Sequence, residues 1–82
     1  MKHATDNVTR WTSTLPDHIG FEVWVRNDFV EGDRAPHFSW SADGGERWYA
    51  SGFPTAKATA AHAHGCSTGI ATLEHQVSTK DE

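Results

Sequence analysis

The sequence contains few of the side chains that usually build a hydrophobic core. Five Val, two Ile, two Leu and four Phe make 13 of the 82 residues, a share below the roughly 20% under which disorder becomes a serious option. Four Trp, one Tyr and a net charge of only −4 oppose disorder, because aromatic rings bury large surfaces and a weakly charged chain repels itself little. We therefore expect a small folded domain with a thin core.

Basic residues are also scarce, with seven Lys and Arg against eleven Asp and Glu. Nucleic-acid backbones are bound by basic surfaces that release counterions, so the charge disfavours such a partner, although a local basic patch remains an option. No apolar run approaches the ~20 residues of a membrane span, and residues 1–7 have no apolar signal-peptide core. The single Cys66 allows no intramolecular disulfide. These features predict a cytoplasmic protein without a membrane partner.

Strict alternation over residues 19–26 is the clearest strand signal. One row is apolar and predicts the core side, and the opposite row faces away from it. A second strand is expected over residues 8–14, which are rich in β-branched side chains and end at Pro16. The two rows of the first strand are Ile19, Phe21, Val23 and Val25 on the core side and Glu22, Trp24 and Arg26 on the other.

A hairpin is expected between residues 37–41 and 46–53, because Asp43-Gly44-Gly45 supplies the positive-φ residues of a tight turn. A loop of two or four residues would pair Trp40 with Arg47 and Phe38 with Tyr49. It would place four rings on the core face and Trp48 on the outer face with Ser39 and Ser41. An odd loop would bring Trp40 and Trp48 together instead. The even loop is favoured because it gathers more rings on one side, namely Phe38, Trp40, Tyr49 and Phe53.

Residues 56–64 predict a helix, because five of these nine residues are Ala. Thr55 is the expected N-cap and Gly65 the expected residue just after the helix. Ala56, Ala60 and Ala63 share one face with Thr59, so the helix can lie close to a sheet. Residues 70–77 fit either a helix or a strand, and Gly69 and the nearby Thr residues favour a strand at the sheet edge.

These elements predict an α+β fold. A three- to four-stranded antiparallel sheet packs on one short Ala-rich helix, with a C-terminal edge strand near residues 70–77. The domain is expected to cover residues 8–77, between a flexible N-terminus (1–7) and a flexible tail (78–82).

The outer face of the predicted sheet carries Trp24, Arg26 and Trp48, which are typical anchors of protein interfaces. Aromatic and Arg side chains on a sheet also stack bases in single-strand binders. Alternatively, residues 8–15 with Trp11 fold over this face, and the rings form a second small core.

The segment His62-Ala63-His64-Gly65-Cys66 contains three metal-ligating side chains. In a helix His62 and His64 differ by ~200° and point to opposite sides. We therefore expect no metal and no cofactor, and keep a site at His62, His64 and Cys66 as an alternative. Thiol catalysis would need an orienting third group that the sequence does not indicate, so no catalytic residue and no enzyme are expected.

Residues 47–61, Arg-Trp-Tyr-Ala-Ser-Gly-Phe-Pro-Thr-Ala-Lys-Ala-Thr-Ala-Ala, resemble the strand-to-helix junction of small domains built from three strands and a helix. The likeness is to the plant ethylene-response DNA-binding domains, the arm-binding domains of phage-type integrases, and short uncharacterised bacterial proteins. It implies the same strand-to-helix order here. If the DNA contacts of those families carry over, the resemblance implies Arg26 and Arg47 with Trp24 and Trp48 as contact residues.

The sequence thus predicts a small non-enzymatic protein that binds another protein, or a second copy of itself, through an aromatic sheet face. Trp24, Arg26, Arg47 and Trp48 are the candidate binding residues. A nucleic-acid module using the same face is the alternative, and the His and Cys metal site is the second alternative.

Overall fold

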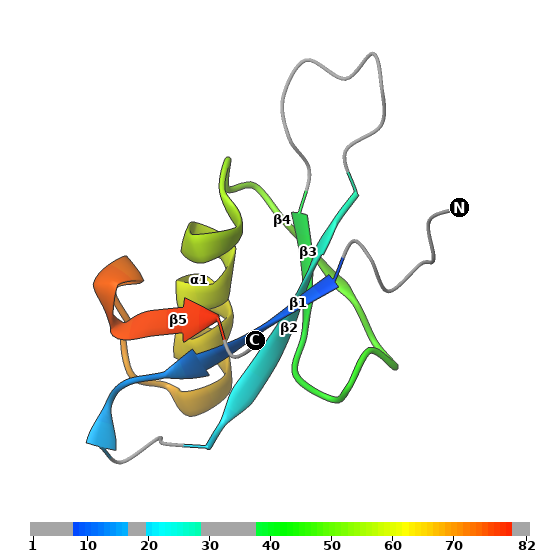
Figure 1. Ribbon diagram of the computed structural model, residues 1–82. Coiled ribbons are helices and arrows are strands. Elements are labelled where there is room, and N and C mark those ends of the chain that lie inside the picture. The colour runs from blue at the N-terminus through cyan, green and yellow to red at the C-terminus, as the bar shows by residue number, and fades with distance from the viewer. Residues whose placement is uncertain (1–7, 17–19, 29–37, 80–82) are drawn as a thin grey trace.

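Within the residues that the structure describes, five short strands form one antiparallel sheet, and an α-helix lies across one of its faces (Figure 1). The computed structural model describes residues 8–16, 20–28 and 38–79. The strand order is β4-β3-β2-β1-β5, and every neighbouring pair is antiparallel. The predicted α+β class is confirmed. The elements are β1 (Val8–Ser13), β2 (Glu22–Asn27), β3 (Phe38–Ser41), β4 (Tyr49–Ser51), α1 (Ala56–Thr68), the 3-10 helix η3 (Glu74–Gln76) and β5 (Val77–Thr79).

The alternating row of β2 faces α1, as predicted. Val23 and Val25 are buried and Phe21 packs against the same cluster, whereas Ile19 lies outside the described residues. β1 pairs with β2 in a register that sets Trp11 opposite Val23. Trp11 is therefore on the helix side, and the interpretation that places it over the outer face is wrong, because residues 8–13 join the sheet as a strand.

Small residues allow α1 to lie close to the sheet. The predicted N-cap is confirmed, because Thr55 Oγ1 accepts the amide of Ala58 at 3.1 Å. The predicted inner face is also confirmed, with Thr59, Ala60 and Ala63 fully buried. These short side chains leave space between the helix and the sheet. Trp11 and Trp40 of the sheet fill it and complete the core.

The helix is longer than the sequence predicts, ending at Thr68 rather than residue 64. The C-cap is Gly69, whose φ of 79° is left-handed and whose amide donates to the Gly65 carbonyl at 2.8 Å. Gly65 has a different role inside the helix. A Cβ there would lie 3.5 Å from the Ile70 carbonyl oxygen and 3.7 Å from the Thr72 nitrogen, so this glycine allows the returning chain to pass closely.

A C-terminal strand is present at the sheet edge next to β1, but not over residues 70–77. Residues 70–73 run past the end of α1 outside any strand, η3 follows, and only Val77–Thr79 pairs with β1. Ser78 and Thr79, assigned above to the tail, face Thr12 and Trp11. Residues 1–7 and 80–82 lie outside the described residues.

The β3–β4 hairpin has the predicted faces but a shifted register. Trp40 pairs with Tyr49 and Phe38 with Ser51, rather than Trp40 with Arg47 and Phe38 with Tyr49. The cause is a longer loop over residues 42–48, in which the Asp43 carboxylate holds two following amides. A shift of two residues preserves the face of every side chain, because the side-chain period of a strand is two.

Phe53 is not part of the buried core, contrary to the prediction. It follows β4 in the connection to α1, is 37% exposed, and stacks against His62 with centroids 5.1 Å apart. Tyr49 shares the helix side with Trp40 at 4.7 Å between centroids, but remains 43% exposed at the short edge strand.

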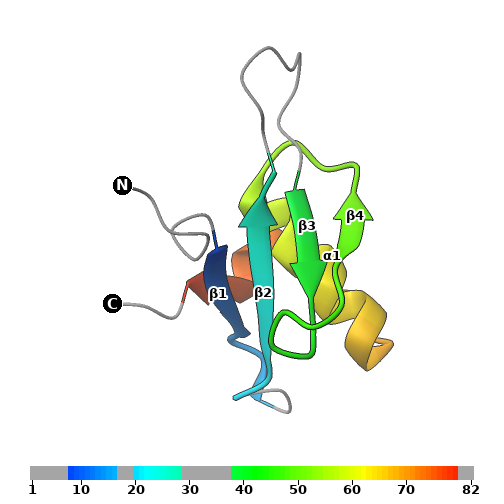
Figure 2. The same cartoon turned by 90° about the vertical axis from the view of Figure 1, so that its right-hand side faces the viewer.

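The sheet face opposite α1 carries no helix or strand within the described residues. Figure 2 shows β1, β2, β3 and β4 toward the viewer, with α1 behind them. We call this side the outer face. In the described ranges no helix is long and apolar enough to cross a membrane.

Candidate binding face of the sheet

A hollow of about 460 Å³ lies on the outer face, between β1, β2 and the loop over residues 42–48. Its volume falls within the range usual for ligand-binding clefts. Neighbouring strands bring the lining together, because Arg10 lies opposite Trp24 and Val8 opposite Arg26 in the β1–β2 register. The lining residues are Val8, Arg10, Trp24, Arg26, Gly44, Gly45 and Trp48.

Arg26 links the loop to the sheet. Its guanidinium carbon lies 4.3 Å from the centroid of the Trp48 ring, within cation–π range. Asp28 holds the same guanidinium with two bonds, at 2.6 Å to Nε and 3.3 Å to Nη2. Ser39 also donates to the Asp28 carboxylate. The Arg26 guanidinium is therefore held both by its bonds to Asp28 and by its contact with the Trp48 ring.

The loop that carries Trp48 is built around a carboxylate. Asp43 accepts the hydroxyl of Ser41 at 2.7 Å and the amides of Glu46 and Arg47 at 3.1 and 3.0 Å. The Ser41 bond, followed by the amide of Arg47, lowers the pKa of Asp43 below its usual 3.8, because these donors favour the charged form. The anionic form of Asp43 therefore stabilises this turn.

Two glycines complete the loop beside Trp48. Gly44 and Gly45 have φ angles of 81° and 98°, which other residues rarely adopt. The indole lies directly against Gly45, where a Cβ would be 3.4 Å from Cζ2 of Trp48. Trp48 thus contacts both the Gly45 backbone and the guanidinium of Arg26.

The charges of this face balance. Arg10 pairs with Glu22 at 3.6 Å, as Arg26 pairs with Asp28 at 2.6 Å. Each guanidinium in the lining therefore faces a carboxylate of its own. Such a face lacks the excess positive charge that binds a phosphate backbone, and it offers rings and aliphatic stems instead.

Three of the four predicted binding residues come together here, namely Trp24, Arg26 and Trp48. Arg47 does not line the hollow. Its neighbour Tyr49 raises the pKa of its guanidinium, first through hydrogen bonding and then through charge. Sequence reasoning missed Arg10, although alternation within residues 8–13 places it on the same row as Thr12, opposite the row of Trp11.

The three residues of the alternative metal site do not come together. His64 is buried against the sheet, with Nε2 3.3 Å from the Trp11 carbonyl oxygen and its ring 5.2 Å from that of Phe21. His62 and Cys66 lie on the exposed side of α1 instead. Within the described part of the chain, no three His, Cys, Asp or Glu residues gather as a metal-binding group.

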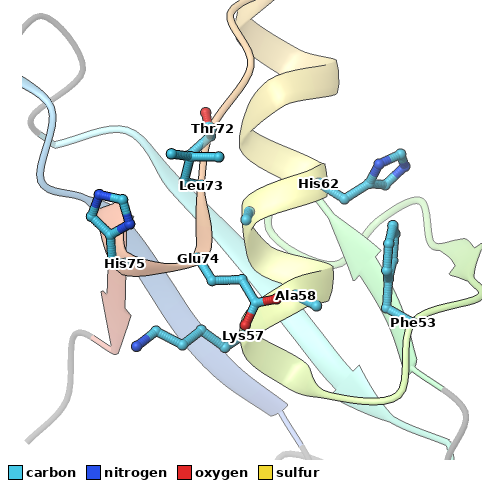
Figure 3. A pocket seen from close by; sticks show the side chains of 9 residues that line it. Phe53, Lys57, Ala58, His62, Thr72, Leu73, Glu74 and His75 are labelled. Carbon is cyan, nitrogen blue, oxygen red and sulfur yellow. The ribbon is translucent and has the colours of Figure 1, made fainter.

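A second hollow, of about 650 Å³, lies on the helix side between α1 and residues 72–75 (Figure 3). Phe53 and Leu73 give it apolar rims, and Leu73 is 57% exposed. Lys57, Glu74 and His75 add a mixed polar border on the side away from His62. This hollow lies on the opposite side of the sheet from Trp24 and Trp48.

Comparison of the chain with family models, curated proteins and solved structures found no match. The resemblance of residues 47–61 to three-stranded DNA-binding domains remains a prediction.

Proposed function

We propose that this protein acts by binding another protein through the outer face, with Trp24, Arg26 and Trp48 as the central contacts. The observation that carries the proposal is the fixed stack of Arg26 on Trp48 beside Trp24, in a hollow on a sheet face that no described helix or strand covers. Trp and Arg dominate the binding energy of many interfaces. Because Arg26 and Trp48 are already held in place, a partner would immobilise few further groups.

The proposal includes a non-enzymatic role and a cytoplasmic location. The hollow is lined by Val, Gly, Trp and Arg side chains, and none of these is a usual nucleophile or general base. The cytoplasmic location is inferred from the single Cys66, which has no partner cysteine in the chain for an intramolecular disulfide.

The test compares Trp24→Ala and Trp48→Ala with Leu73→Ala, which removes an exposed apolar side chain from the opposite side of the sheet. Tagged copies of the chain are used to capture proteins from a lysate. Each captured protein is then purified, and its affinity for all three variants is measured by titration. Sedimentation of the chain alone measures association with a second copy. We expect both Trp variants to weaken binding at least tenfold and Leu73→Ala to leave it unchanged. Equal binding or equal self-association by all variants would contradict the proposal.

A nucleic-acid module using the same face is the alternative. Arg10 adds a second guanidinium beside Trp24, but Glu22 and Asp28 neutralise both cations, so this reading is the weaker one. An amide-correlation NMR titration with a short mixed oligonucleotide at low salt distinguishes nucleic-acid binding from protein binding. Indole shifts of Trp24 and Trp48 that added salt reverses would favour the nucleic acid. Under the protein-binding proposal we expect no such shifts.

A further inference from the structure

The side chains that line the hollow on the outer face donate hydrogen bonds and accept none. They belong to Val8, Arg10, Trp24, Arg26 and Trp48, and the two remaining lining residues are glycines. A valine side chain makes no hydrogen bond, and the guanidinium and indole groups carry N–H donors without an acceptor. A partner seated in this hollow is therefore matched when it brings acceptors, because donors placed against donors leave both groups unsatisfied.

Two of these donors are available to a partner. Within the described part of the chain, the indole N–H groups of Trp24 and Trp48 have no hydrogen-bond acceptor, whereas that of Trp11 donates to Thr9 at 2.8 Å. The nitrogen side of the Trp48 indole adjoins the hollow, since its Cε2 and Nε1 both lie 3.9 Å from a Cβ placed on Gly45, a lining residue. A carbonyl group of a partner can therefore accept from this face without breaking a bond inside the chain.

The charge of the hollow selects a neutral partner. Glu22 pairs with Arg10 at 3.6 Å and Asp28 with Arg26 at 2.6 Å, so two cations meet two anions. An anionic partner finds no uncompensated positive charge here, and a cationic partner meets the guanidinium groups of the lining. The acceptors that fit are therefore uncharged ones, such as the carbonyl oxygens of a peptide.

A peptide on this face cannot bind as an added strand. β1 and β2, which carry four of the lining residues, are inner strands of the sheet, because β5 flanks β1 and β3 flanks β2. Strand addition needs a free sheet edge. An ordinary residue of a bound peptide also brings a backbone N–H, and neither the paired strands nor the lining side chains offer it an acceptor.

We propose that the part of the partner protein that enters the hollow is a proline-rich segment in the polyproline II conformation. This inference rests on the proposed function and specifies its partner. Proline has a carbonyl acceptor and no backbone N–H, so a proline-rich segment matches a lining of donors. Its rings pack on the faces of Trp24 and Trp48, of which the latter is already held by Arg26. Polyproline II is extended before it binds, which reduces the entropy lost on binding.

The probe is decaproline, capped by an acetyl group and an amide so that it carries no charge. In an amide-correlation NMR titration of the full chain, we expect saturable shifts of the Trp24 and Trp48 indole signals and an unmoved Trp11 signal. Added salt should leave the affinity unchanged, because no phosphate charge is neutralised. The matched control is a capped peptide in which glutamine replaces every second proline. It adds N–H donors and should bind about tenfold more weakly.

Variants of the chain assign the contacts. Trp48→Phe retains an aromatic ring and removes the indole N–H, so it should weaken decaproline binding, but less than Trp48→Ala does. Leu73→Ala, on the opposite side of the sheet, should leave the affinity unchanged. Circular dichroism checks that each variant folds, and Trp48→Phe alone provides the test if Trp48→Ala does not.

Two outcomes overturn the inference. They are the absence of a saturable shift of both indole signals with decaproline, and equal affinity for decaproline and the glutamine peptide. If proteins captured from a lysate still lose affinity for Trp24→Ala and Trp48→Ala, the proposed function stands and only the proline-rich partner is rejected. If captured proteins bind these variants as tightly as the natural chain, the proposed function fails as well.

Discussion

The guanidinium carbon of Arg26 lies 4.3 Å from the centre of the Trp48 ring, and this contact connects a loop to the middle of the sheet. Arg26 belongs to β2, whereas Trp48 ends the loop that precedes β4. Asp28 orients the guanidinium and Gly45 admits the indole. The outer face therefore depends on four residues that are scattered along the sequence.

Asp28→Asn should release this arrangement. Without the carboxylate charge, Arg26 loses its ion pair, and the Trp48 ring loses a fixed neighbour. We expect the indole N–H signal of Trp48 to shift and broaden in an NMR spectrum. The Trp11 signal should stay in place, because its Nε1 donates to Thr9 at 2.8 Å on the other side of the sheet. Glu74→Gln, an exposed acid on the helix side, is the control. An unchanged Trp48 signal in Asp28→Asn would show that Asp28 does not position the stack.

Asp43 should make stability depend on acid pH. Its pKa is lower in the folded chain than its usual 3.8, so the stability that its charge contributes is present above that value. It is lost as the pH falls through the lower folded-state pKa. Urea unfolding of Asp43→Asn and the natural chain should differ at pH 7 and converge well below pH 3.8. A difference that is equal at both pH values would argue that the charge of Asp43 has no role.

His64→Ala should destabilise the fold strongly. The imidazole is 1% exposed, packs against Phe21, and lies 3.3 Å from the Trp11 carbonyl oxygen, so its removal leaves a cavity between α1 and the sheet. We expect a loss of about 2–4 kcal/mol in the free energy of unfolding. His75→Ala, at an exposed position, should change it by less than about 0.5 kcal/mol. Urea unfolding of both variants measures this, and equal small losses would place His64 outside the core.

Gly69→Ala should destabilise the end of α1. The φ angle of 79° at this position is left-handed, which costs a residue with a Cβ about 1–2 kcal/mol. Gly52→Ala is the control, because Gly52 has no positive φ and no atom within 4 Å of an added Cβ. Thermal unfolding should therefore show a lower midpoint for Gly69→Ala alone. A similar midpoint for both variants would contradict the assignment of Gly69 as the cap.

Part of this site could be predicted because strand alternation is a local property. Residues 21–26 already separate the Val23 row from the Trp24 row, and the pairing of Trp40 with Tyr49 in the hairpin sets Trp48 beside the latter. The sequence predicts Arg47 as a binding residue and does not indicate Arg10, because the placement of both depends on non-local contacts. Which loop residue turns toward the sheet, and which strand lies beside β2, depend on contacts between distant segments.

The amino-acid sequence alone determined the α+β class, the two faces of β2 and the Thr55 cap. It also determined that small residues of the helix pack against large aromatic rings of the sheet. Each of these follows from side-chain period or from groups a few residues apart. Tertiary structure alone decided that β1 lies between β2 and β5, that Arg10 faces Trp24 and that Arg26 meets Trp48. Each of these outcomes joins segments that are far apart in the sequence, and no local pattern encodes such a contact.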